Sequence, residues 1–366
     1  MRILYVITST GAGGAENALL SLAITLNKNH TIKVVSLKPS GLYADELKKH
    51  GIEVLSLDMG YWPRPGDLKK LKKIIADFKP DIVHALLYRA IQMCRVLKGG
   101  FKLFTTPHTN YQNKSKFLRI VDAALKSKDD VSLAESRSTA DFLIVNQRYN
   151  KNKVKVILNS VGGGFGRGAD GRKKFRAEND CADKIIFITV ARLEKIKGHR
   201  FLLDAFAKIY RKKKNAVLWL VGDGTEKENL SAAATAMGIK NAVKFWGRQK
   251  DVAQFLNAAD IFVLPSSSES LPLSLLEAAA CGLSMVAADT GDNSNVVRHG
   301  QNGFICNVQD PVMLAAVMGE LADNKKLREK FGSKSLQISA ELSSDYAQEH
   351  LEVYTSFPLP ERERAG

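Results

Sequence analysis

The 366-residue chain has only four cysteines and no long apolar run. Cys94, Cys181, Cys281 and Cys306 are scattered, with no Cys-x-x-Cys pair and no histidine at a zinc-like spacing. This pattern excludes a disulfide framework and predicts four reduced, mostly buried thiols. Because no stretch approaches about 18 consecutive apolar residues, no membrane-spanning helix is expected.

A signal-peptide pattern and an Asp-x-Asp metal motif are also missing from the sequence. The N-terminus reads at once as an apolar strand, Arg2–Ile7, so the protein is expected to remain in the cytoplasm. With 45% apolar and 25% charged residues, the chain has the composition of a globular protein. Its length predicts about two domains, each with its own core.

Short apolar strands alternate with helical segments along the whole chain. Such alternation predicts an α/β fold with parallel sheets that helices cover on both faces. After residues 2–7, the expected strands are 31–37, 53–57, 81–85, 102–106 and 155–158 in the first half, and 184–191, 216–221, 243–246, 260–264 and 284–287 in the second.

A glycine-rich segment, Ser160–Arg172, separates the two halves and is expected to hold neither helix nor strand. We interpret it as an interdomain linker. The predicted organisation is an N-terminal domain 1–160, a linker 161–182, a C-terminal domain 183–342, a final helix 343–357 and a flexible tail 358–366.

Two carboxylates stand eight positions apart in the segment from Ser266 to Gly282. Glu269 lies in a small-residue loop, and Glu277 is expected two turns inside the following helix. Pro272 suits the first helical turn and Gly282 suits its left-handed end. The free amides of such a helix start attract an anion such as a phosphate, whereas the carboxylates suit the neutral hydroxyls of a sugar and a ribose. The segment therefore favours a sugar nucleotide as ligand.

Each of these carboxylates has an ordinary alternative as a solvated surface charge, since charged residues are mostly exposed. Glu277, however, is bracketed by leucines and alanines, which places it away from open water.

The spacing resembles the Glu-x7-Glu signature of retaining glycosyltransferases with the two-domain GT-B fold, in particular family 4. This resemblance covers nearly the whole chain, and it implies two Rossmann-like domains that face each other across a cleft.

The resemblance extends to two further loops. Gly13 and Gly14 belong to a segment, Gly11–Glu16, that is similar to the family's first glycine loop. Arg192 and Lys197, after the strand 184–191, resemble the family's paired cations on the donor diphosphate. Each could also be an ordinary surface cation. The resemblance implies a donor site formed by Gly13, Gly14, Arg192, Lys197, Glu269, Ser270, Leu271 and Glu277, with no metal and no other cofactor required.

Two histidines follow strands of the first half at the ends where open α/β sheets bind ligands. His84 comes directly after Asp81–Val83, and we interpret it as a packed structural residue. His108 follows the strand 102–106, and the resemblance implies that it contacts the donor sugar. The catalytic residues implied are thus Glu269, His108, Arg192 and Lys197.

Positive charge is concentrated in the first half. Residues 1–160 carry 26 Lys+Arg against 13 Asp+Glu, a net +13, whereas the remainder is close to neutral at +3. One basic run interleaves Lys69, Lys70, Lys72, Lys73 and Lys79 with an apolar helical face, which is equally consistent with an ordinary solvated helix. A second run, Lys114–Arg119, follows His108. Such surfaces suit an anionic membrane or a phosphorylated lipid acceptor, and no nucleic-acid-binding motif is present.

The sequence therefore predicts a retaining, metal-independent glycosyltransferase that acts at the inner face of the cytoplasmic membrane. The expected donor is a nucleotide-sugar, with UDP-sugar favoured over GDP-sugar. The expected acceptor is an envelope glycan or a lipid-linked molecule such as lipopolysaccharide. Two alternatives stay open: a nucleotide-sugar epimerase on the same fold, and a non-catalytic relative that binds membranes or polyanions.

Overall fold

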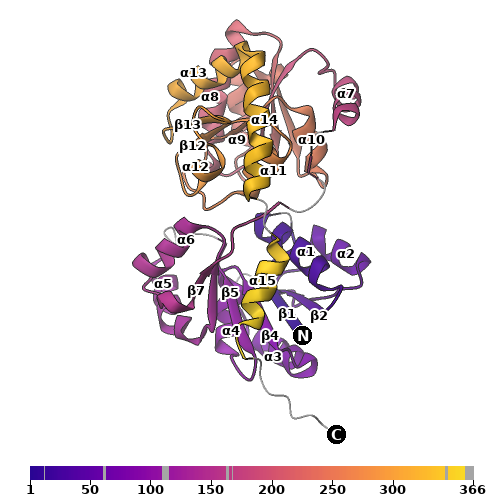
Figure 1. Ribbon diagram of the computed structural model, residues 1–366, viewed down its shortest axis with the longest axis vertical. Coiled ribbons are helices and arrows are strands. Elements are labelled where there is room, and N and C mark those ends of the chain that lie inside the picture. Colours follow the sequence, from indigo (N-terminus) through magenta and orange to yellow (C-terminus); the bar gives the residue numbers. More distant parts are fainter. Residues whose placement is uncertain are drawn as a thin grey trace. The chain divides into compact units, whose positions relative to one another are not determined.

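The computed structural model describes residues 1–11, 13–60, 63–108, 115–161, 165–166, 168–342 and 345–358. The chain forms two compact units (Figure 1). The first unit comprises Met1–Asn159 together with the C-terminal segment from Ser344, and the second comprises Ser160–Ser343. The proposed tail beyond residue 358 lies outside the described residues.

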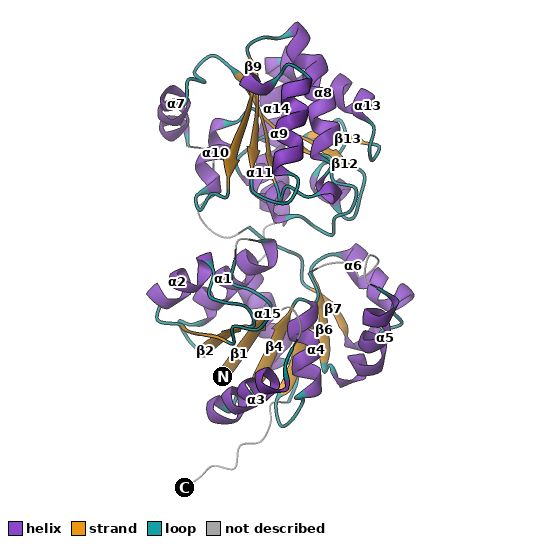
Figure 2. Ribbon diagram, turned by 180° about the vertical axis from the view of Figure 1, so that it is seen from behind, coloured by secondary structure: helices purple, strands orange, loops and turns teal. Residues whose placement is uncertain are grey.

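The first unit is built on a parallel sheet with the strand order β3-β2-β1-β4-β5-β6-β7. Figure 2 shows helices on both sides of this sheet. Its strands are β1 (Arg2–Ile7), β2 (Thr31–Ser36), β3 (Glu53–Ser56), β4 (Ile82–Leu86), β5 (Lys102–Thr106), β6 (Val131–Ala134) and β7 (Val154–Val156). Its helices are α1 (Gly14–Leu26), α2 (Leu42–Lys49), α3 (Pro65–Phe78), α4 (Tyr88–Val96), α5 (Lys116–Leu125), α6 (Arg137–Asp141) and α15 (Tyr346–Thr355).

The second unit has a parallel sheet of its own, with the order β10-β9-β8-β11-β12-β13. The strands are β8 (Ile185–Val190), β9 (Ala216–Val221), β10 (Val243–Gly247), β11 (Ile261–Leu264), β12 (Ser284–Ala288) and β13 (Gly303–Cys306). The helices are α7 (Ala169–Glu178), α8 (His199–Lys212), α9 (Lys227–Ala236), α10 (Val252–Ala258), α11 (Leu273–Ala280), α12 (Asn293–Val296), α13 (Pro311–Asp323) and α14 (Lys325–Leu342).

The central strands of both sheets are apolar along their whole length because both of their faces are covered. All five residues of β1 from Ile3 to Ile7 are fully buried, and so are Ile186–Ile188 in β8. This is the pattern expected of a parallel α/β sheet. The predicted fold class, two Rossmann-like units with parallel sheets, is confirmed. All four cysteines are free and buried, also as predicted.

The last helix, α15, packs with the first unit although it follows the second in sequence. Ala347 and Tyr354 join the core cluster that contains residues of β1, β4 and β5. Figure 1 shows this helix, in yellow, beside α1 and the first sheet. A C-terminal element of the chain therefore contributes to the core of the first unit.

The expectation that the glycine-rich segment holds no helix is wrong for its C-terminal part. Helix α7 begins at Ala169, inside both Ser160–Arg172 and the proposed linker 161–182. Arg172 and Arg176 on this helix form ion pairs with Asp260, the residue before β11. Because these long-range ion pairs fasten α7 to the second unit, glycine content alone does not determine the local structure there.

Candidate active site

Two loops of the second unit are joined at the carboxyl edge of its sheet, where β8 and β11 lie next to each other. The Ser267 amide and hydroxyl both donate to the Ile196 carbonyl, at 2.8 and 3.1 Å. Gly198 has a φ of 70°, and a Cβ there would lie 2.1 Å from the Pro265 carbonyl oxygen. Only glycine suits both conditions. The loop that carries Lys197 is thereby fixed against the loop that carries Glu269.

Lys197 and Glu269 form an ion pair across this junction. The Lys197 Nζ donates to Glu269 Oε1 at 2.7 Å and to Oε2 at 2.9 Å. The side chains are only 17% and 8% exposed, so little water screens the pair. An ammonium group has three donors, and the carboxylate uses two of them. The structure thus brings together two of the residues predicted from sequence and leaves one ammonium donor for another acceptor.

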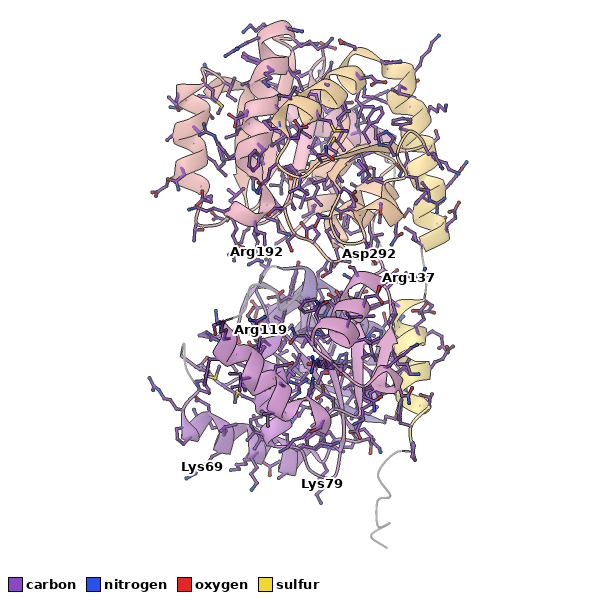
Figure 3. All side chains as sticks on the ribbon, turned by 90° about the vertical axis from the view of Figure 1, so that its left-hand side faces the viewer. Lys69, Lys79, Arg119, Arg137, Arg192 and Asp292 are labelled. Atoms are coloured by element: carbon purple, nitrogen blue, oxygen red, sulfur yellow. The ribbon has the colours of Figure 1, made fainter. Side chains whose placement is uncertain are left out.

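Arg192 lies on the same loop but is not part of this ion pair. Its Nη1 contacts Glu194 Oε1 at 2.7 Å, and its side chain is 58% exposed. Figure 3 labels Arg192 at the surface of the second unit. No interaction joining Arg192 to Lys197 or Glu269 is seen among the residues described. The structure therefore shows Arg192 as an accessible cation on the loop that also carries Lys197.

Helix α11 begins at Leu273, so the loop with Glu269 is longer than expected and Glu277 lies just over one turn inside the helix. The expectation that Glu277 lies two turns inside the helix is wrong, because Pro272 precedes the helix and is not in its first turn. Gly282 has the predicted left-handed backbone, with a φ of 68°. Glu277 is 7% exposed, which excludes the interpretation of a solvated surface charge.

Ser270 and Leu271 complete the loop before α11. The Ser270 carbonyl accepts from the Asp292 amide at 2.7 Å, and Leu271 is buried. Gly291, with a φ of 56°, packs directly on this backbone, since a Cβ there would lie 2.3 Å from the Glu269 carbonyl oxygen. The backbone around Glu269 is therefore fixed from a third segment of the unit.

His199 is a buried residue of this region that sequence reasoning missed. It is the first residue of α8, two positions after Lys197, and 2% exposed. Neither ring nitrogen has a well-formed hydrogen bond among the described residues, although the Glu194 backbone interacts with the ring. Burial, and then the nearby Lys197 charge, lower its pKa to about 4, so the ring is neutral at pH 7. The only signal in the sequence is a histidine directly after the Lys-Gly pair.

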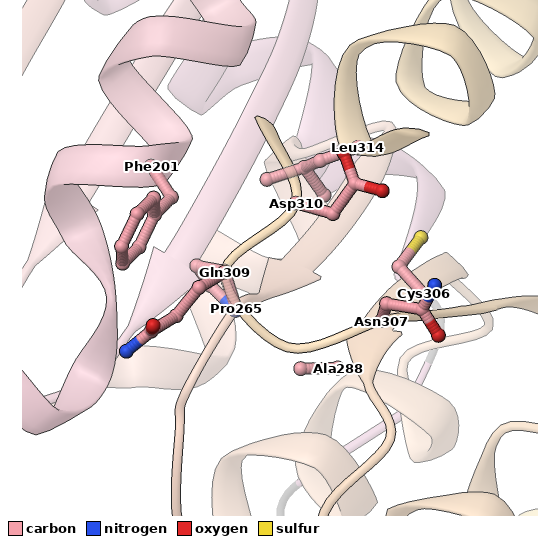
Figure 4. Close-up of a pocket in the computed structure, with 8 residues that line it drawn as sticks. All are labelled: Phe201, Pro265, Ala288, Cys306, Asn307, Gln309, Asp310 and Leu314. Atoms are coloured by element: carbon pink, nitrogen blue, oxygen red, sulfur yellow. The ribbon is translucent and has the colours of Figure 1, made fainter. Parts of the chain in front are cut away.

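A small cavity opens at the same edge of the second sheet (Figure 4). Pro265, Ala288 and Cys306, which end or follow β11, β12 and β13, form part of its wall. Burial raises the pKa of the Cys306 thiol to about 11, so this cysteine is not a nucleophile at pH 7. The rest of the lining combines the apolar Phe201 and Leu314 with the polar Asn307, Gln309 and Asp310.

The first unit has strained backbone at the carboxyl ends of β4 and β5. His108 has a φ of 52° and Leu87 a φ of 69°. Left-handed backbone is uncommon outside glycine, costs on the order of 1–3 kcal/mol, and is concentrated at functional sites. The Leu87 amide donates to the Thr106 carbonyl at 3.0 Å, which ties the two loops together. This edge is the ligand-binding edge expected of an open parallel sheet.

His108 is held neutral at this edge. Burial, and then the neighbouring His350 of α15, lower its pKa to about 3. Its Nε2 is buried and has no hydrogen-bond partner among the described residues. A neutral imidazole nitrogen in this state can bind a sugar hydroxyl, but it does not carry a positive charge to a phosphate.

His84 is a structural residue, as interpreted from the sequence. It lies in the middle of β4, so the expectation that it follows the end of a strand is wrong. Its Nδ1 and Nε2 are each 2.7 Å from a hydroxyl, those of Tyr354 and Thr106 respectively. Burial, with His350 and His108 nearby, lowers its pKa well below the usual range. His84 is therefore a neutral member of a buried hydrogen-bond chain.

The glycine loop before α1 is occupied by its own acidic residue. Gly13 precedes the helix and Gly14 begins it. The Glu16 carboxylate folds back over Gly13, where a Cβ would lie 2.3 Å from Oε2, and it accepts from the Ser9 hydroxyl at 2.7 Å. A carboxylate at this helix start repels a phosphate but accepts hydrogen bonds from sugar hydroxyls.

The two basic segments of the first unit differ in the way their helices pack. In α3 the apolar face, including Leu71 and Phe78, is covered by the core. The lysines at positions 69, 70, 72 and 73 are exposed, and so is Lys79 directly after the helix. In α5 the only buried residue is Asp122, whereas Phe117 and Ile120 are 64% and 66% exposed. Figure 3 labels Lys69, Lys79 and Arg119 on these surfaces. Lys114 lies outside the described residues.

Within the described ranges, no group of three or more His, Cys, Asp or Glu side chains could hold a metal ion. In the same ranges, no helix combines the length and hydropathy that crossing a bilayer requires.

Two parallel-sheet units with charged and strained residues at their carboxyl edges define a two-domain α/β enzyme of the GT-B type. Family models support this class directly. Residues 171–337 match the glycosyl transferases group 1, and residues 12–162 match the glycosyltransferase family 4. The two matches fall in both units, and the chain belongs to the group 1 glycosyltransferases of the GT-B fold. It is therefore a glycosyltransferase.

Relatives of known name agree with this assignment. The chain is 27% identical over 329 residues to the lipopolysaccharide core biosynthesis glycosyltransferase LpsE of Rhizobium meliloti, an alignment that covers 88% of this chain and 89% of the relative. The crystal structure of Anabaena HepE in complex with UDP-glucose superposes with a TM-score of 0.88 at 22% identity and covers 98% of this chain and 100% of that one. The structure of WaaG, a glycosyltransferase involved in lipopolysaccharide biosynthesis, superposes at 0.81 with 14% identity, covering 98% and 100%.

Proposed function

We propose that the protein transfers a sugar from a nucleotide-sugar, UDP-sugar in preference to GDP-sugar, to a hydroxyl of an envelope glycan or lipid-linked acceptor such as lipopolysaccharide. The observation that carries this proposal is the Lys197–Glu269 ion pair beside the start of α11. The names of the relatives support the same choice, since LpsE acts in lipopolysaccharide core biosynthesis and HepE was solved with UDP-glucose.

In this proposal, Lys197 directs its remaining donor to the diphosphate while Glu269 holds the ammonium in place. Arg192 turns from Glu194 to the same diphosphate, because a phosphate carries more charge than one carboxylate. Together they stabilise the negative charge that grows as the glycosidic bond breaks, with no need for a metal. Glu277 binds the ribose hydroxyls, Ser270 and Leu271 shape the donor loop, and Gly13, Gly14 and His108 contact the sugar.

Retention of anomeric configuration follows if the leaving diphosphate takes the proton of the acceptor hydroxyl on the same face of the sugar. No side chain then acts as general base, which agrees with a Glu269 carboxylate that is already held in the ion pair with Lys197. We therefore expect a product with the donor's anomeric configuration, and full activity in excess EDTA.

NMR of the product determines the anomeric configuration of the transferred sugar. Measuring nucleotide release with and without a panel of sugar and lipid acceptors identifies the reaction. An inverted product argues against retention, and activity that EDTA abolishes and Mg²⁺ restores argues against metal independence. Donor consumed without any acceptor, with a second sugar epimer formed, supports the epimerase. Donor never consumed, with membrane binding intact, supports the non-catalytic alternative.

We also propose that the protein attaches peripherally to the inner face of the cytoplasmic membrane through α5. This helix exposes Phe117 and Ile120 one turn apart, with Lys116 and Arg119 exposed between and beside them. Exposed apolar groups next to basic ones suit the interface of an anionic bilayer. The lysines of α3 add positive charge but no apolar contact, because the core covers its apolar face.

The double variant Phe117→Ser/Ile120→Ser should bind anionic vesicles at least tenfold more weakly, because burying such side chains contributes about 1.5–3 kcal/mol each. Neutralising Lys116 and Arg119 should weaken binding further and reduce its salt dependence, at about 1 kcal/mol per charge. Co-sedimentation measures both effects. Val312→Ser is the matched control, since Val312 is 65% exposed on α13 of the second unit. Equal binding by all variants would contradict the role of α5.

A further inference from the structure

Helix α15 docks on the first unit with a polar face. Tyr354 is fully buried and His350 is 2% exposed, next to the apolar Ala347. Burying a polar group without partners costs free energy, so an apolar face would dock this ten-residue helix at a lower free-energy cost. The partners of these two residues therefore indicate what the polar face does.

A hydrogen-bond chain runs from α15 through the sheet. The Tyr354 hydroxyl lies 2.7 Å from His84 Nδ1, and His84 Nε2 lies 2.7 Å from Thr106 Oγ1. The Tyr5 hydroxyl, 3.4 Å from that of Tyr354, extends the chain into β1. Because a neutral imidazole donates at one nitrogen and accepts at the other, His84 satisfies both neighbouring hydroxyls in either tautomer.

The hydrogen-bond chain ends at Thr106, the last residue of β5, which is held from two sides. Its hydroxyl contacts His84, and its carbonyl accepts from the strained Leu87. Pro107 and the strained His108 follow immediately. Left-handed backbone at a non-glycine residue persists only where its surroundings over-determine it. Thr106 is the point where the buried core reaches this strained loop.

We propose that Tyr354 and His84 are positioning residues for His108, so that the last helix of the chain sets the geometry of the loop after β5. This inference rests on the proposed role of His108 in contacting the sugar. A contact near the reaction centre that moves by about 1 Å can cost on the order of 10²-fold in rate. Because the second unit holds the nucleotide in this proposal, a displaced His108 should change donor affinity much less than it changes kcat.

Tyr354→Phe is the variant that tests the chain, because it keeps the ring and its packing against Phe104 and removes only the hydroxyl. We expect kcat to fall about tenfold or more, within the range for a misplaced contact, with the KM for donor within twofold of wild type. Thr106→Val, which removes the other end of the chain, should do the same. Thr355→Ala, on the exposed side of the same helix, and Tyr210→Phe, a hydroxyl deletion in the second unit, are controls expected to keep wild-type kcat.

Histidine ring NMR signals supply a measurement that loss of stability alone would not change. In folded Tyr354→Phe, we expect the signals of both His84 and His108 to shift. Shifted His84 signals with unchanged His108 signals and unchanged kcat would overturn the positioning role. If the variant His108→Ala keeps wild-type kcat, the proposed contact of His108 with the sugar is wrong. In that case the NMR signals of His108 in Tyr354→Phe still show whether α15 positions His108.

Discussion

Replacing Lys197 with methionine should lower kcat about 10²–10³-fold, the usual cost of removing one preorganised electrostatic contact to developing charge. Methionine keeps most of the length of the side chain, so the loop packing around Gly198 is preserved. The KM for donor should change much less than kcat, because the charge on the diphosphate grows as the bond breaks. Steady-state kinetics with a saturating acceptor measure both constants.

Lys195→Met is the matched control, since Lys195 lies in the same short turn and is exposed. It should retain wild-type kcat. Arg192→Ala should lower kcat in the same direction as Lys197→Met. A raised donor KM with kcat intact in Lys197→Met would mean that the ammonium binds ground state and transition state equally, and would contradict its proposed role.

Most strands were predictable because buried parallel strands are continuous apolar runs. The range 102–106 was predicted without error for β5, and the limits of β1 and β9 were also matched. Two strands were missed, β6 (Val131–Ala134) and β13 (Gly303–Cys306). Both have only four residues and mix apolar with small or polar ones, so their strand character depends on pairing with a neighbour and not on a local pattern.

The sequence indicates candidate site residues but does not indicate their contacts. The Glu269 and Glu277 spacing indicates the right helix, yet nothing local shows that Lys197, 72 positions earlier, pairs with Glu269. That pairing requires β8 and β11 to be neighbours, which is a property of the sheet order. His199 was missed for the same reason, because its burial comes from the tertiary structure.

The outward-facing apolar side of α5 has its cause in a buried charge cluster that the sequence does not reveal. Arg95 on α4 is fully buried and contacts Asp129 through Nε at 2.7 Å and Nη2 at 2.6 Å. Its Nη1 contacts Asp122 of α5 at 2.7 Å, and the Tyr149 hydroxyl contacts the same carboxylate at 2.9 Å. Because Asp122 is the residue that α5 buries, the helix turns Phe117 and Ile120 outward.

Arg95→Met should therefore lower the free energy of unfolding of the first unit by about 3–5 kcal/mol, because it leaves the carboxylates of Asp122 and Asp129 buried without their cation. Urea denaturation followed by far-UV circular dichroism, fitted with a transition for each unit, measures the loss. Arg298→Met is the control. Arg298 pairs with Glu341 at 2.6 Å, but the side chains are 35% and 49% exposed, so the loss should stay below about 1 kcal/mol.

Asp122→Asn separates stability from membrane attachment, since it keeps the size of the side chain and weakens only the hold on α5. If the cluster fixes the orientation of α5, this variant should stay folded at 25 °C and bind anionic vesicles more weakly than wild type, although Phe117 and Ile120 are unchanged.

A loss of less than about 1 kcal/mol in Arg95→Met would show that the two carboxylates find other partners or take up protons, and that the cluster does not hold the helix.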